Sequence, residues 1–164
     1  MHNSSILYFL VEPLDPTLPE SLAATPVLDG VPLTRLIDEF ETSQGFDAPG
    51  GYAGLLPRNH SFGPIYIHFL ADLDEFNLAG DWEIQDVDLL GCSCGDSDCW
   101  PLKSSITKST ETVTWSNFTQ PHRPDRLYTG FGPFHFNLEQ YKSAVNQLAE
   151  QFLPKAAAPE STRL

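Results

Sequence analysis

Hydrophobic and polar residues follow strand-like and helix-like spacings along most of this chain. The segment SILYFLVE, Ser5–Glu12, is rich in aromatic and β-branched residues and stops before Pro13, which predicts a strand. Alternating apolar residues predict another strand over 65–73, IYIHFLADL. The proline-containing segment 14–25 and the glycine-rich segment 44–64 are expected to be loops.

Two segments have the apolar spacing of an amphipathic helix. Over 33–42, apolar side chains recur at i, i+3, i+4 and i+7, and a short hairpin turning at Asp29-Gly30 is expected just before. Over 137–152, Asn137 can cap the helix, and Gln140 stands three residues later, as a capping box requires. The two apolar stripes consist of Leu33, Leu36, Ile37 and Phe40 and of Leu138, Tyr141, Val145, Leu148 and Phe152. Both helices are therefore expected to pack on a sheet.

The middle of the chain has the clearest strand pattern. Strands are predicted over 82–94, 99–107 and 113–120, with short turns between them. Such short connections favour a three-stranded antiparallel meander. Pro101 indicates that the second of these strands is irregular or lies at an edge there.

Length and composition fit one domain with its own core. The chain has 164 residues, of which 41% are hydrophobic. A chain of this size buries roughly 70% of its unfolded surface, so it needs neither disulfides nor a metal to fold. We predict an α+β fold in which a single domain, 1–154, combines an antiparallel sheet with helices over 33–42 and 137–152. Residues 155–164 are expected to form a frayed C-terminal tail.

Negative charge is concentrated in the first two thirds of the chain. The net charge is −13, and residues 1–102 hold seventeen acidic and two basic residues, a balance of −15. Such a surface repels nucleic acid and favours a basic protein partner, although a merely solvated face has the same composition. The residues expected to meet that partner are Asp72, Asp74, Glu75, Asp86 and Asp88.

The apolar run near the N-terminus is short. Ile6–Val11 is too short for a signal peptide or a membrane span, and no basic residue precedes it. We therefore expect a cytoplasmic protein with no membrane association. An odd number of cysteines in a reducing compartment favours free thiols or a metal over disulfides.

All three cysteines lie in the stretch LLGCSCGDSDCWPL. Side chains alternate along a strand, so Cys92 and Cys94 are expected to point to one side. If 95–98 is a hairpin loop, Cys94 and Cys99 face each other across it, with Cβ atoms about 5 Å apart. The three thiols are therefore expected to converge on one face of a ribbon.

One interpretation of this convergence is a zinc site. Zinc takes four ligands, at about 2.3 Å for sulfur and 2.0 Å for an imidazole nitrogen. Cys92, Cys94 and Cys99 would supply three, and His122 at the end of the third meander strand is the preferred fourth, with His135 and His68 as the next choices. The spacing Cys-x-Cys-x4-Cys is not that of standard zinc knuckles.

Two other interpretations stay open. The cysteines can be small buried side chains under a turn, since free cysteine is often buried. Cys94 and Cys99 can also be a redox dithiol, although Asp96 and Asp98 would raise rather than lower the pKa of a nearby thiol. A catalytic pair of Cys99 with His122 is a further alternative, but no third orienting group accompanies it.

Three segments together resemble a family of small, uncharacterised bacterial proteins. LLGCSCGDSDCWPL, VTWSNFTQPHRP and GFGPFHFNLEQY stand in this order between Leu89 and Tyr141. The family shares GC-(S/T)-CG-x3-CWPL, V-x-W-x-x-F-x-QPHR and GPF-x-F-x-x-x-QY. The resemblance implies a shared domain and no particular activity. In the turn, this sequence has Asp96-Ser97-Asp98 where members of the family commonly have three residues that include a glycine. The positions it marks are Cys92, Cys94, Cys99, Trp100, His122 and Arg123.

The sequence contains none of the common signatures of hydrolases, nucleotide-binding loops or metalloproteases. Arg123 and Arg126 flank His122 closely enough to bind an anion, or to pair with the acidic half of the chain. The sequence therefore favours a non-enzymatic, acidic, protein-binding module of the immunity or antitoxin kind. The alternative is a zinc- or thiol-dependent enzyme centred on Cys92, Cys94 and Cys99.

Overall fold

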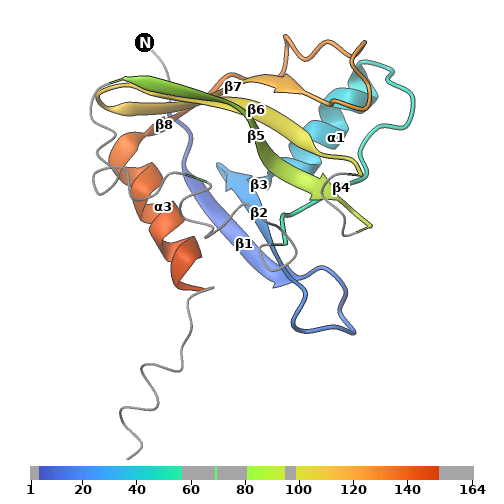
Figure 1. Cartoon of the computed structure of the whole chain (residues 1–164), viewed down its shortest axis with the longest axis horizontal. Helices are drawn as coiled ribbons and strands as arrows, with labels where there is room; N and C mark the ends of the chain where they lie inside the picture. Colours follow the sequence, from blue (N-terminus) through green and yellow to red (C-terminus); the bar gives the residue numbers. More distant parts are fainter. Residues whose placement is uncertain (1–3, 57–68, 70–80, 95–98, 152–164) are drawn as a thin grey trace, which may run out of the picture.

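The computed structural model describes residues 4–56, 69, 81–94 and 99–151 (Figure 1). Two antiparallel sheets and two helices make up the described fold, which confirms the predicted α+β class. The elements are β1 Leu7–Pro13, β2 Leu22–Leu28, β3 Val31–Pro32, α1 Leu33–Ser43, β4 Tyr52–Ala53, β5 Trp82–Cys92, β6 Leu102–Lys108, β7 Thr112–Thr119, β8 Phe134–Asn137 and α3 Leu138–Glu150.

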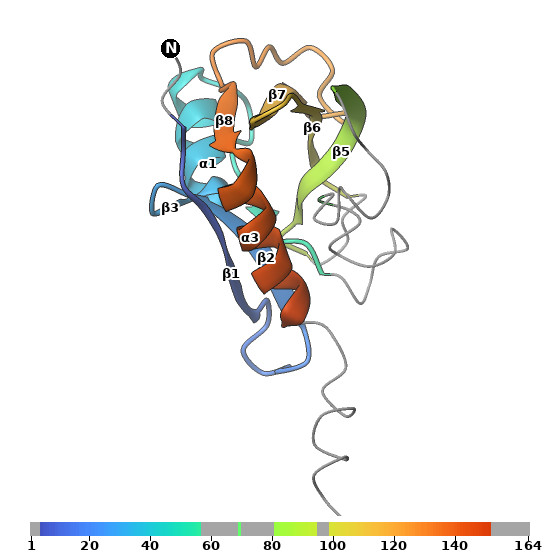
Figure 2. The ribbon, with the colours of Figure 1, turned by 90° about the vertical axis from the view of Figure 1, so that its left-hand side faces the viewer.

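The two sheets are joined by a bridge at either side. The first sheet has the order β1-β2-β3 and the second the order β4-β5-β6-β7-β8. Ser5 pairs with Phe136 of β8, and Ala24 of β2 pairs with Leu55 just after β4. The strands thus surround one hydrophobic core, to which both sheets and both helices contribute (Figures 1 and 2). Its largest fully buried side chains are Trp115, Tyr141, Phe69 and Phe136.

The helix α3 lies against β1 (Figure 2). Asn137 caps the helix as predicted, because its side chain accepts a hydrogen bond from the backbone N–H of Gln140 at 3.0 Å. The reciprocal hydrogen bond of a capping box, from the backbone N–H of Asn137 to the Gln140 side chain, is absent. The Gln140 amide instead accepts from Leu7 N at 3.0 Å and donates to Leu7 O at 2.6 Å, so it satisfies the backbone of β1.

The meander of β5, β6 and β7 is also confirmed, but its strands have different ends. β5 stops at Cys92, and β6 begins only at Leu102, with Leu90 opposite Leu102. The register shifts between Ile84 and Val87, where a β-bulge leaves Asp86 at a positive φ of 60°. The predicted second strand over 99–107 was therefore wrong at its start, since its first residues turn away from the ladder.

Two strands, β2 and β4, occupy segments that were expected to be loops. β2 begins inside 14–25 and pairs with all of β1, and the burial of Ala24 and Leu28 against the core outweighs the weak local pattern. β4 and β8 are short and contribute one strand to either edge of the larger sheet. The predicted strand over 65–73, apart from Phe69, and the tail 155–164 lie outside the described residues. Among the helices of the described part, none is both long and apolar enough to span a membrane.

Candidate metal centre

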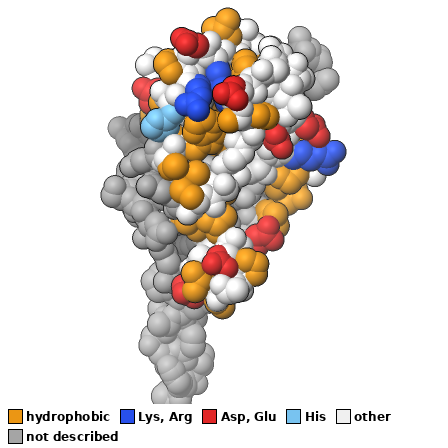
Figure 3. Space-filling model, turned by 90° about the vertical axis from the view of Figure 1, so that its right-hand side faces the viewer, with side chains coloured by type: hydrophobic (Ala, Val, Ile, Leu, Met, Phe, Trp, Pro, Cys, Tyr) orange, Lys and Arg blue, Asp and Glu red, His pale blue; other side chains and the backbone are white. Residues whose placement is uncertain are grey.

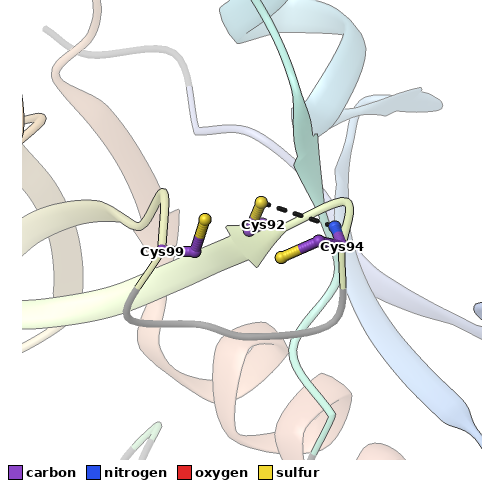
Figure 4. A group of neighbouring side chains, drawn as sticks. All are labelled: Cys92, Cys94 and Cys99. Carbon is purple, nitrogen blue, oxygen red and sulfur yellow. Dashed lines mark hydrogen bonds between the residues drawn. The ribbon is translucent and has the colours of Figure 1, made fainter.

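The three cysteines come together at the end of β5. Their Sγ atoms all lie within 4.8 Å of one another, as the sequence predicted (Figure 4). Cys92 is half-buried, whereas Cys94 and Cys99 are exposed. The backbone N–H of Cys94 lies 3.4 Å from the Cys92 sulfur and donates to it. The site is therefore a cluster of three thiols open to the surface.

The route to this convergence differs from the predicted one. Cys92 is the last residue of β5 and pairs with Tyr52 of β4, not with a residue of β6. Cys94 and Cys99 lie in turns beyond the strand ends, so they are not cross-strand partners in a ladder. The sulfurs gather because the chain turns at 93–94, after the end of β5, and again at Cys99; residues 95–98 lie outside the described part of the chain (Figure 4).

The predicted fourth ligand lies elsewhere. Within the described residues, the group of metal-ligating side chains consists of the three cysteines and does not include His122. The His122 ring stacks on Trp100 at 4° between planes and 6.5 Å between centroids. His135 lies on β8 with its Nδ1 3.0 Å from Thr114 Oγ1, and His68 is outside the described part of the chain.

Cys99 is poorly suited to act as a free thiolate. Hydrogen bonding with the thiols of Cys92 and then of Cys94 raises the pKa of Cys99 to about 11. Near neutral pH and without a cation, this thiol is therefore protonated, which weakens it as a nucleophile or as an attacking dithiol. A metal cation reverses this preference, because it binds thiolates and releases their protons.

The spacing of the sulfurs suits a small thiophilic ion. In a tetrahedral zinc site with bonds of about 2.3 Å, two sulfur ligands lie about 3.8 Å apart. The observed sulfurs are within 4.8 Å of one another, so only small side-chain rotations separate the two arrangements. The three sulfurs therefore suit three of the four positions of a tetrahedral zinc site, and the described residues place no fourth metal-ligating side chain beside them.

The acidic residues predicted to meet a partner have different surroundings. Asp86 is exposed at the bulge in β5. Asp88 is largely covered and forms an ion pair with Lys103 of β6 at 2.6 Å. Asp72, Asp74 and Glu75 lie outside the described residues.

Sequence reasoning missed a fully buried carboxylate, Glu41 near the end of α1. Its Oε2 atom accepts hydrogen bonds from the hydroxyls of Tyr52 at 2.7 Å and Tyr128 at 2.6 Å. Its Oε1 atom accepts from the backbone N–H of Gly50 at 2.8 Å. Arg126 Nη1 lies 3.1 Å from Oε2, and this ion pair is buried on both sides. Such a buried charge is tolerated because it is both paired and hydrogen-bonded.

A sequence signal for this residue exists. Leu33, Ile37 and Glu41 follow one another at i+4 spacing, and all three are buried in the structure. A carboxylate that continues the apolar stripe of an amphipathic helix needs a buried partner, since an isolated charge there is too costly.

The segment 50–52 connects this carboxylate to the cysteines. Trp100, directly after Cys99, donates from Nε1 to Gly50 O at 2.8 Å. Ser93, between the other two cysteines, donates from its backbone N–H to Gly51 O at 2.9 Å. Gly50 has a φ of +77°, and a Cβ there would lie 2.9 Å from Asp38 Oδ1, so the turn requires glycine.

The tyrosines around Glu41 are held in their neutral form. Burial, followed by the hydrogen bond to Glu41, raises the pKa of Tyr128 to about 12. Burial is also the main cause that raises the pKa of Tyr52. Both hydroxyls therefore stay protonated and donate to the carboxylate, which makes the network a fixed support rather than a proton store.

Comparisons of the chain with protein-family models, with curated proteins and with solved structures gave no match. The family resemblance seen in the sequence therefore stays a prediction.

Proposed function

We propose that this protein binds a zinc ion through the thiolates of Cys92, Cys94 and Cys99. The observation that carries the proposal is the approach of the three Sγ atoms to within 4.8 Å of one another at the surface. Three thiolates form a soft donor set, which selects zinc over magnesium or calcium.

Metal binding accounts for the properties of Cys99 better than thiol chemistry does. The pKa of Cys99 is raised to about 11 by the neighbouring thiols, whereas a nucleophilic or redox cysteine needs a lowered pKa. The large core also holds the fold together without a metal. The zinc would therefore act locally, by fixing the loop between Cys92 and Cys99.

Elemental analysis tests this proposal directly. Protein purified without an affinity tag or chelator is expected to carry about one zinc ion per chain, and Cys99→Ser is expected to lose it. Ser93→Ala lies between two of the cysteines and removes no thiol, so it serves as the matched control. Cobalt substitution adds a spectroscopic measure, because cobalt bound to thiolates absorbs strongly in the near ultraviolet.

Either of two results would reject the zinc site. One is wild-type protein that takes up no zinc or cobalt after reduction of its thiols. The other is uptake that is equal in the wild type and in Cys99→Ser.

A second candidate function is binding of a basic protein by an acidic surface along β5. Asp81, Glu83 and Asp86 are exposed there. Of the basic residues on the neighbouring strand, Lys103 is already paired with Asp88 and Lys108 is buried. The acidic surface is thus left for an outside partner, and opposite charges would speed their encounter.

Neutralising these three residues tests the second candidate. The variant Asp81→Asn, Glu83→Gln, Asp86→Asn is expected to lose any basic protein that the wild type retains at low salt and releases at high salt. Identical retention by wild type and variant would reject the acidic surface and leave the zinc proposal untouched.

A further inference from the structure

A cavity lies between two segments that are distant in the sequence, next to the arginines that contact Trp100. Its volume is about 440 Å³, and it opens between the segment that follows α1 and the segment that follows β7. The residues that line it are Gly45, Phe46, Asp47, His122, Arg123, Pro124, Asp125 and Arg126. A cavity of this volume is large enough for a small organic molecule.

Basic groups gather at this cavity, although the protein as a whole is strongly acidic. The net charge is −13, yet two arginines and a histidine line one small space. The guanidinium carbons of Arg123 and Arg126 lie 4.8 Å and 5.5 Å from the centre of the same indole ring, that of Trp100. Figure 3 shows basic side chains and a histidine together near the upper end of one face, beside hydrophobic ones.

The two arginines differ in whether a carboxylate of the protein already neutralises their charge. Arg126 forms the buried ion pair with Glu41. Its Nη2 group donates to the backbone carbonyls of Asp47 and Ala48. Arg126 is therefore part of the cavity floor and has its carboxylate in place.

Arg123 is held in place by two contacts but forms no ion pair with the residues that the structure describes. Its Nη1 donates to the carbonyl of His122 at 2.9 Å, and its guanidinium lies over Trp100. Within the described part of the chain, none of the ion pairs involves Arg123. A guanidinium held in this way loses little side-chain entropy when it binds a ligand, and its planar fork matches a carboxylate.

We infer that this cavity binds a small monocarboxylate, whose carboxylate meets the guanidinium of Arg123. Phe46 and Pro124 provide apolar surface for the rest of the ligand. Asp47 and Asp125 line the same cavity and repel a second negative charge, so a phosphate dianion is the disfavoured ligand.

Nuclear magnetic resonance titrations test this inference. Benzoate is added to isotopically labelled protein at constant ionic strength, and inorganic phosphate is added to a second sample. Benzoate is expected to shift the amides of 45–47 and 122–126 to saturation, with a dissociation constant of about 1 mM or lower. Arg123→Gln is expected to weaken this binding about tenfold or more.

The matched control is Arg35→Gln, because Arg35 is exposed on α1 and pairs with Glu39. This variant is expected to bind benzoate as the wild type does. Shifts that do not saturate, equal affinity in Arg123→Gln, or tighter binding of phosphate would each overturn the inference. None of these measurements involves the cysteines, so their outcome is independent of the zinc proposal.

Discussion

The Tyr52 hydroxyl donates to the buried Glu41 carboxylate at 2.7 Å, and Tyr52 pairs in the sheet with Cys92. One residue thus contacts both the charged centre of the core and the first ligand of the candidate metal site. Gln120 Nε2 donates to the same hydroxyl at 3.1 Å, so the end of β7 joins the network too. The strand end that carries Cys92 is consequently attached to this buried hydrogen-bonded network.

Replacing Glu41 by glutamine is expected to destabilise the protein strongly. The change leaves Arg126 buried without its counter-charge, which costs about 3–5 kcal/mol in comparable buried pairs. Urea unfolding measures the loss. The control is Glu39→Gln on the exposed side of α1, where the change is expected to stay within about 1 kcal/mol. Equal effects of the two substitutions would contradict the assigned role of Glu41.

Replacing Gln140 by alanine is expected to loosen β1 from α3. Two hydrogen bonds between its amide and the backbone of Leu7 disappear, with an expected loss of about 1–3 kcal/mol in unfolding free energy. Gln147→Ala is a matched control, since it removes the same side chain from an exposed position of the same helix. Faster amide exchange at Leu7 in the first variant alone would locate the effect in β1.

Metal affinity is expected to rise with pH. Since the pKa of Cys99 is raised to about 11, this thiol must lose a proton on binding zinc throughout the neutral range. Each proton released makes the apparent dissociation constant fall about tenfold per pH unit. Competition with a chromophoric chelator between pH 6 and 8 measures the slope. A flat profile would mean that thiolates are not the ligands.

The same raised pKa has a consequence for the metal-free protein. The folded state favours the neutral thiol of Cys99, so this contribution to stability is complete below the ordinary pKa of 9.0. It is lost as the pH rises from there through about 11. Bound zinc is expected to abolish this alkaline loss, which thermal unfolding with and without a chelator can measure.

Replacing Trp100 by phenylalanine is expected to weaken zinc binding without unfolding the protein. The ring remains, but the donation from Nε1 to Gly50 O is lost, so the turn beside Cys99 is held less firmly. A loss of one neutral hydrogen bond corresponds to a decrease in affinity of about tenfold or less. Tyr8→Phe, an exposed change in β1, is the control and is expected to leave affinity unchanged. Unchanged affinity in Trp100→Phe would separate the indole from the metal site.

The local spacing of apolar residues predicted those helices and strands that bury a regular row of apolar side chains. Helix α1 has a strong apolar pattern because Leu33 and Ile37 face the core. The meander has one because Leu90 of β5 and Ile106 of β6 do the same. The strands β4 and β8 have too few residues for a pattern to emerge, and their existence depends on partners in β5 and β7. Pairing over long distances decides such short strands, so a local reading of the chain misses them.

The candidate site was predictable in its composition but not in its surroundings. Three cysteines within eight residues converge if the chain reverses between Cys94 and Cys99, and the segment Gly-Asp-Ser-Asp between them predicted that reversal. The neighbours of the loop come from distant segments, namely the turn at Gly50 and the residue His122. His122 lies near the end of β7 as expected, but there it stacks on Trp100 and does not join the sulfur cluster.

The bridge between Ser5 and Phe136 has a consequence for how the protein forms during synthesis. β1 is made early, yet Ser5 bonds His135 and Leu7 bonds Gln140. These partners leave the ribosome more than a hundred residues later, at about 5–20 residues per second. The outer edge of β1 therefore stays unpaired during that interval, and Leu7 and Phe9, which are buried in the folded protein, are expected to be only partly covered until β8 and α3 have been made.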